Sequence, residues 1–96
     1  MTLNEILKSK REQILRTAKE HGASNVRVFG SVARGEADEQ SDIDLLVDFE
    51  PGKTLFNHAA LSIALQQLMG IQVDVISSRG LKERIRERVL REAVLL

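Results

Sequence analysis

The chain has 96 residues, of which 43% are hydrophobic and 29% are charged, and its formal net charge is zero. These values are ordinary for a globular protein and exclude a disordered or fibrous chain, and the length predicts a single domain over residues 1–96 with one modest core. The balanced charge favours neither an anionic membrane nor direct nucleic-acid binding as the function.

The first 50 residues predict one helix and two strands. Thr2 and Glu5 form a capping-box pattern, and apolar residues follow at helical spacing, so the first helix is expected to end near residues 21–22. The β-branched segment 25–29 predicts a strand that stops at Gly30. Segment 42–49 predicts the second strand. Its residues alternate between one face (Ile43, Leu45, Val47, Phe49) and the other (Asp42, Asp44, Leu46, Asp48).

The second half predicts a helix, a third strand and a last helix. Thr54 is expected to cap the helix that Gly70 ends. Segment 71–76 predicts a strand, and apolar spacing from Leu81 onward predicts a helix that reaches the chain end. The apolar stripe of the middle helix is expected to consist of Phe56, Ala60, Ile63, Ala64 and Leu68.

This order of elements predicts a three-stranded core sheet with helices covering one face, in the α/β (α+β) class. No apolar run approaches the roughly 18 residues of a membrane span, and the charged segment 1–10 lacks the apolar core of a signal peptide. A cytoplasmic location is therefore expected.

Asp42 and Asp44 are the first candidates for chemistry. At an i, i+2 spacing they share one face of a strand, with backbones roughly 6.6 Å apart, whereas on a helix they would diverge. The sequence has no cysteine and only two histidines, so any metal site must be built from carboxylates. Hard oxygen ligands of this kind suit Mg²⁺ or Mn²⁺, and two ions about 3.5–4 Å apart are typical of phosphoryl-transfer sites.

Asp74 is the third candidate ligand. It lies in the middle of the third predicted strand between Val73 and Val75, where an unpaired carboxylate would be unfavourable to bury, so a cation is expected beside it. Asp48 shares the strand face of Asp42 and Asp44, but it lies close to the turn at residues 50–52. Asp48 is therefore expected to be solvated.

A glycine-serine pair completes the motif. Phe29-Gly30-Ser31 is followed by ten residues and then by Asp42-Ile43-Asp44-Leu45. A glycine after a strand permits close backbone approach to a phosphate. With the opening Gly-Ser-x-Ala-Arg-Gly and the later Asp74, the chain resembles the minimal nucleotidyltransferases of the DNA polymerase β superfamily. It is most similar to the small prokaryotic members that act as antitoxins beside a HEPN-domain ribonuclease toxin.

The resemblance implies a polymerase-β-like fold and an ATP-consuming enzyme with two Mg²⁺ ions, or Mn²⁺ in their place. It implies that Gly30 and Ser31 hold the triphosphate, that Asp42 and Asp44 ligate both metals, and that Asp74 completes one metal site beside the acceptor hydroxyl. These three aspartates would be the catalytic residues. Arg34 is expected either to contact the phosphates or to pair with Glu36 or Asp38. The sequence does not distinguish between these two roles of Arg34.

The resemblance also implies a partner. The expected activity is transfer of AMP to a tyrosine of a HEPN-type toxin, with which the chain would form a hetero-oligomer, and the short chain favours an acceptor on another polypeptide. Two alternatives stay open. One is an antitoxin that neutralises by contact alone, through residues 93–96 and the basic last helix, and the other is a nucleotidyltransferase acting on a small molecule or RNA. A calcium loop starting at Asp38 is disfavoured, because it lacks the glycine after Asp44 and the terminal glutamate.

Overall fold

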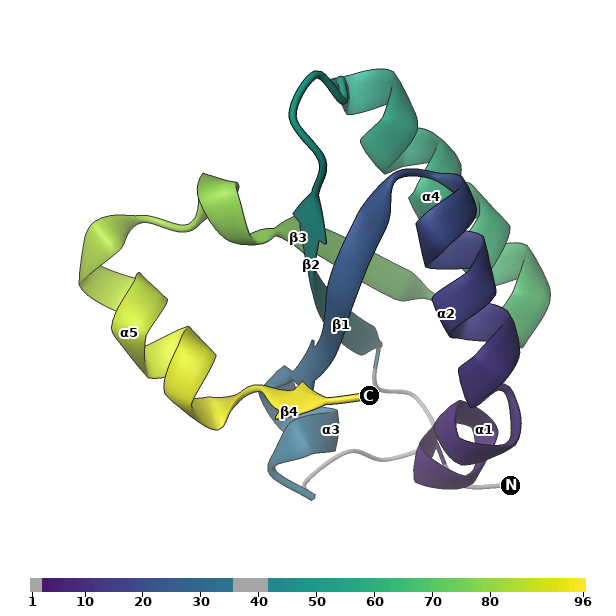
Figure 1. Ribbon diagram of the computed structural model, residues 1–96. Helices are drawn as coiled ribbons and strands as arrows, with labels where there is room; N and C mark the ends of the chain where they lie inside the picture. Colours follow the sequence, from purple (N-terminus) through teal and green to yellow (C-terminus); the bar gives the residue numbers. More distant parts are fainter. Residues whose placement is uncertain (1–2, 36–41) are drawn as a thin grey trace.

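The computed structural model describes residues 3–35 and 42–96, and Figure 1 shows how their elements are arranged. The predicted Thr2 cap lies outside these residues. In chain order the elements are α1 (Leu3–Ser9), α2 (Arg11–Glu20), β1 (Ala23–Phe29), α3 (Gly30–Ala33), β2 (Ile43–Phe49), α4 (Leu55–Met69), β3 (Val73–Ser77), the 3-10 helix η1 (Ser78–Gly80), α5 (Glu83–Glu92) and β4 (Val94–Leu95).

The strands form one mixed sheet in the order β3-β2-β1-β4. β1 is antiparallel to β2 and to β4, whereas β2 and β3 are parallel. The predicted α/β class and the three core strands are confirmed. The prediction that the last helix reaches the chain end is wrong, because α5 ends at Glu92 and Val94 then pairs with Val28. A strand of two residues is too short to produce a periodic pattern in the sequence.

The first predicted helix is divided in two at Lys10. The backbone of Lys10 (φ −108°, ψ 12°) leaves helical geometry between α1 and α2. Its ammonium group donates a hydrogen bond of 2.9 Å to the carbonyl of Leu68, at the far end of α4. The prediction of one continuous helix was therefore wrong, and the contact that Lys10 makes at this break joins residues 58 positions apart, which local periodicity does not reveal.

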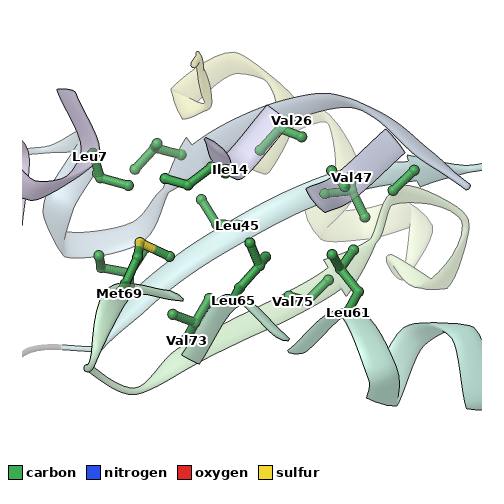
Figure 2. Packing of buried hydrophobic residues seen from close by; sticks show 14 of the residues in the cluster. Leu7, Ile14, Val26, Leu45, Val47, Leu61, Leu65, Met69, Val73 and Val75 are labelled. Atoms are coloured by element: carbon green, nitrogen blue, oxygen red, sulfur yellow. The ribbon is translucent and has the colours of Figure 1, made fainter. Parts of the chain in front are cut away.

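The core lies between the sheet and the pair α2 and α4, which pack side by side against the same face (Figure 1). Figure 2 shows the interdigitating side chains, among them Ile14 of α2, Leu45 of β2 and Leu65 of α4, each with no exposed surface. Burial of such side chains stabilises the fold by about 1.5–3 kcal/mol each relative to exposure. α5 lies on the other side of the sheet, and none of its residues is buried.

Helix α4 has the predicted ends but not the predicted buried face. Thr54 forms a capping box with Asn57, and Gly70 ends the helix with a left-handed φ of 70°. The buried residues of α4 are Leu61, Leu65 and Met69, whereas Phe56 of the predicted stripe is 87% exposed and Ile63 is 54% exposed. The apolar residues of α4 are distributed over nearly all sides of the helix, so the periodicity does not single out one face. The contact with the sheet decides which face is buried.

The apolar helix α4 has 15 residues, and none of the helices in segments 3–35 and 42–96 has the length and hydropathy of a membrane span.

Asp48 of β2 links its own strand to β1 and η1, on the face of the sheet that α2 and α4 do not cover. Its carboxylate accepts hydrogen bonds from Asn25 Nδ2 (2.8 Å), Arg27 Nη2 (2.6 Å) and Ser78 Oγ (2.5 Å). Asn25 has a φ of 50° in the irregular stretch of β1 between Ser24 and Arg27. The expectation that Asp48 is solvated was therefore wrong. Partial burial by itself would raise the pKa of Asp48, but the bonds from Ser78, Asn25 and Arg27 hold that pKa below its ordinary value.

Replacing this carboxylate should destabilise the fold in a pH-dependent way. Because the folded-state pKa is lowered, Asp48 stabilises the protein above its unfolded pKa of about 3.9, and this contribution is lost as the pH falls through the folded-state pKa. We expect Asp48→Asn to lower the free energy of unfolding by about 1–2 kcal/mol at pH 7. Urea unfolding at several pH values should show this difference shrinking below about pH 4. The control Glu50→Gln removes an exposed acid two residues away and should change little at any pH.

Candidate active site

The register of the sheet places two of the predicted acidic residues next to each other. Asp44 of β2 lies directly opposite Asp74 of the parallel strand β3, and it also lies opposite Phe29 at the end of β1. Residues directly opposite each other on paired strands project from the same face. Asp44 and Asp74 therefore share the face of the sheet that α2 and α4 do not cover, and Gly30 follows Phe29 immediately beside them.

The electrostatics of Asp44 reflect this crowding. Partial burial raises the pKa of Asp44 above its ordinary value, and the neighbouring charges of Asp74 and Asp42 raise this pKa further. The positive charge of Arg34 acts in the opposite direction. Asp42, exposed and just before β2, is thus close enough to influence Asp44. The three aspartates create a region of negative potential with one arginine at its border.

The donor set of this region fits a divalent cation. As the side chains stand, no three acidic or histidine groups of residues 3–35 and 42–96 are close enough together to hold a metal ion. The crowding at Asp44 nevertheless favours a cation, because a positive ion would relieve the repulsion among three carboxylates. Carboxylate oxygens are the ligands that Mg²⁺ and Mn²⁺ prefer. The acids present therefore suit the metal that the sequence predicts.

Gly30 turns the backbone tightly against Asp44. Its φ of 74° is in the left-handed region. A Cβ atom built on Gly30 would overlap with Asp44 Oδ2 and lie only 3.3 Å from Asp44 Cγ. Glycine is therefore required here both by the backbone angle and by the space beside the carboxylate. Ser31 belongs to α3, but its side chain lies outside the described part of the structure.

Arg34 follows α3 and approaches the same region from the side. Its Nη1 atom lies 3.7 Å from Oε2 of Glu92, the last residue of α5. The two acids that the sequence suggested as partners, Glu36 and Asp38, lie outside the described residues. Glu92 was not a candidate in the sequence. No local signal marks it, because only the return of β4 alongside β1 brings the end of α5 close to α3.

Comparison with known proteins identifies the family. Residues 7–96 match the family described as the nucleotidyltransferase domain. The chain belongs to this family. This nucleotidyltransferase is 41% identical over 99 residues to the protein adenylyltransferase MntA of Thermococcus cleftensis, covering 98% of this chain and 95% of the relative. It is 37% identical over 94 residues to a candidate protein adenylyltransferase of Methanocaldococcus jannaschii, covering 98% and 97%.

Solved structures agree with this family assignment. A structure described as that of a candidate minimal nucleotidyltransferase is 58% identical, covers 100% of this chain and 97% of its own, and superposes with a TM-score of 0.90. The toxin-antitoxin MntA-HpeT contains a chain with the same fold, at 21% identity and a TM-score of 0.72, covering 93% of this nucleotidyltransferase and 70% of that chain. The resemblance to the minimal nucleotidyltransferases is confirmed, and with it the prediction that the protein is an enzyme.

Two glycine substitutions should separate backbone strain from crowding at Asp44. Gly52 has a φ of 88° with nothing within 4 Å of an added Cβ, so Gly52→Ala imposes backbone strain alone. Gly30→Ala adds an overlap with the Asp44 carboxylate to the same strain. We expect losses in unfolding free energy of about 1 kcal/mol for Gly52→Ala and about 2–3 kcal/mol for Gly30→Ala, measured by urea denaturation. Equal losses would mean that Asp44 does not require the space beside Gly30.

Proposed function

We propose that this nucleotidyltransferase transfers AMP from ATP to a tyrosine hydroxyl of a HEPN-type toxin and thereby acts as its antitoxin. Two relatives of nearly the same length carry the name protein adenylyltransferase. Structures that share the fold include a toxin-antitoxin complex with AMP-PNP and the MntA-HpeT complex. These names support an adenylyl donor and a protein acceptor for this chain as well.

One observation carries the proposal, namely the direct pairing of Asp44 with Asp74 across two parallel strands, on the open face and beside Gly30. A structural role alone does not account for three carboxylates that repel one another at this position. Nucleotidyl transfer requires such an arrangement, because the reaction depends mainly on positioning and on neutralisation of phosphate charge.

In the proposed mechanism, Asp42 and Asp44 would hold two Mg²⁺ ions and Asp74 would complete one of these sites next to the acceptor. When bound, the metals would neutralise the phosphates and promote loss of the hydroxyl proton. Gly30 and Ser31 would bind the triphosphate through the backbone of the turn, and Arg34 would add positive charge. The deprotonated hydroxyl oxygen would attack the α-phosphorus in line, forming the new O–P bond as the bond to pyrophosphate breaks.

A second candidate function, neutralisation of the toxin by contact alone, is favoured by the exposed apolar edge of the sheet. Val94 and Leu95 of β4 are 55% and 71% exposed, respectively. Next to them lies a cavity of about 510 Å³, between β4 and the helices α1 and α3. Exposed apolar surface of this kind is typical of protein interfaces. A contact-only antitoxin, however, has no use for the acidic cluster.

Labelling of the partner should distinguish the two functions. The chain is co-expressed with the protein encoded by the neighbouring reading frame, and the intact mass of that partner is measured. We expect wild-type protein to add AMP to the partner, and Asp42→Asn, Asp44→Asn and Asp74→Asn each to lower the labelling rate at least about 100-fold, because each removes a metal ligand.

Two controls accompany this experiment. Glu50→Gln, which changes an exposed acid after the same strand, should label like wild type, and growth of the producing cells should report neutralisation independently of labelling. If the Asp42/Asp44 double variant neutralises the toxin as well as wild type does, neutralisation is by contact. Transfer of AMP to RNA or a small molecule, with an unmodified partner, would contradict the proposed acceptor.

A further inference from the structure

Glu92 lies where helix α5 meets the proposed nucleotide site. We propose that Glu92 is a positioning residue for the reaction, which holds the guanidinium of Arg34 in place to receive the triphosphate. This inference rests on the proposed function and extends it to a residue on a different element. Its basis is the ion pair of 3.7 Å between Glu92 Oε2 and Arg34 Nη1, which links the end of α5 to the end of α3.

Glu92, at the end of α5, has a different environment from Glu87, in the middle of the same helix. Glu87 pairs with Arg91 one turn along the same helix and remains 87% exposed, facing solvent. Glu92 makes the equivalent contact with Arg88 at 3.5 Å, but its side chain is only 36% exposed because it also reaches Arg34. The two glutamates thus share charge, helix and type of intrahelical ion pair. They differ in the contact with the body of the protein.

The C-terminal end of α5 is where the helix is attached to the rest of the protein. No residue of α5 is buried, and Figure 1 shows the helix apart from the sheet until the chain enters β4. There the pairing of Val94 with Val28 fixes the backbone two residues after Glu92. Glu92 therefore has a more defined position than the rest of α5. It offers Arg34 an anchor attached to the sheet.

The chemistry of arginine makes such an anchor useful. A guanidinium has five N–H donors in a planar fork, so it can pair with Glu92 and bind a phosphate oxygen at the same time. The charge of Arg34 already acts on Asp44, and the contact with Glu92 opposes movement of the guanidinium toward the acids. An ion pair this exposed contributes little to the stability of the fold, but even a weak restraint would reduce the conformational freedom that Arg34 loses when the nucleotide binds.

The affinity of the 96-residue chain for AMP-PNP in the presence of Mg²⁺ tests the inference. Isothermal titration calorimetry would compare wild type with Glu92→Gln, Glu92→Asp, Arg34→Gln and the Arg34/Glu92 double variant. We expect Glu92→Gln to weaken binding about threefold to tenfold, Glu92→Asp to restore part of the loss, and Glu92→Gln to add nothing once Arg34 is replaced. When the rate of AMP transfer to the partner is measured, Glu92→Gln should raise the KM for ATP, while kcat at saturating ATP stays within about twofold of the wild-type value.

Glu87→Gln is the matched control, because it removes the same charge and a comparable intrahelical ion pair from α5 without contacting Arg34. It should bind AMP-PNP like wild type. Wild-type affinity in Glu92→Gln, equal losses in the two glutamate variants, or additive effects of Arg34→Gln and Glu92→Gln would each overturn the positioning role. If wild type itself failed to bind AMP-PNP with Mg²⁺, the proposed function would fall, and this inference with it.

Discussion

The parallel pairing of β2 with β3 is the constraint on which the site depends. Ile43, Leu45 and Val47 occupy one face of β2, and they fill the core in the register that sets Ile43 opposite Val73. The same register puts Asp44 opposite Asp74. A shift by one residue would exchange the two faces of the strand, burying carboxylates and exposing the apolar side chains. The strong preference of the core for one register therefore imposes an unfavourable meeting of like charges on the opposite face.

Such a conflict between stability and local electrostatics is characteristic of functional sites. Partial burial and two neighbouring carboxylates raise the pKa of Asp44. Asp48, four residues along the same strand, shows the contrasting case. Three donors surround its carboxylate and lower its pKa, so it stabilises the fold. Two acids on one strand face thus have opposite environments and, in our interpretation, opposite purposes.

The two faces of the sheet have different roles. α2 and α4 close one face and supply the core, which leaves the other face for the acids, the turn at Gly30 and the loosely attached α5. The Arg34–Glu92 contact is the point where α5 reaches this site. The exposed apolar residues, Leu55 and Phe56 on α4 and Leu95 on β4, lie on elements other than those that carry the acids. A partner could cover such surfaces and still leave access to the acidic face.

The sequence alone determined the features that depend on neighbours along the chain. The two-residue period of residues 43–49 placed Asp42 and Asp44 on one face, Thr54 and Gly70 marked the ends of α4, and the spacing of Gly30, Ser31 and the aspartates indicated the family that the comparisons confirm. The strand face and the helix ends are properties of local backbone geometry, which a few consecutive residues dictate, and the family motif is a spacing that can be read directly along the chain.

Only the tertiary structure decided the rest. The break at Lys10, the buried face of α4, the partners of Asp48, the strand β4 and the approach of Glu92 to Arg34 all depend on contacts between segments far apart in the chain. Such contacts form when packing of the whole core selects among arrangements that are equally good locally, and periodicity contains no information about that selection.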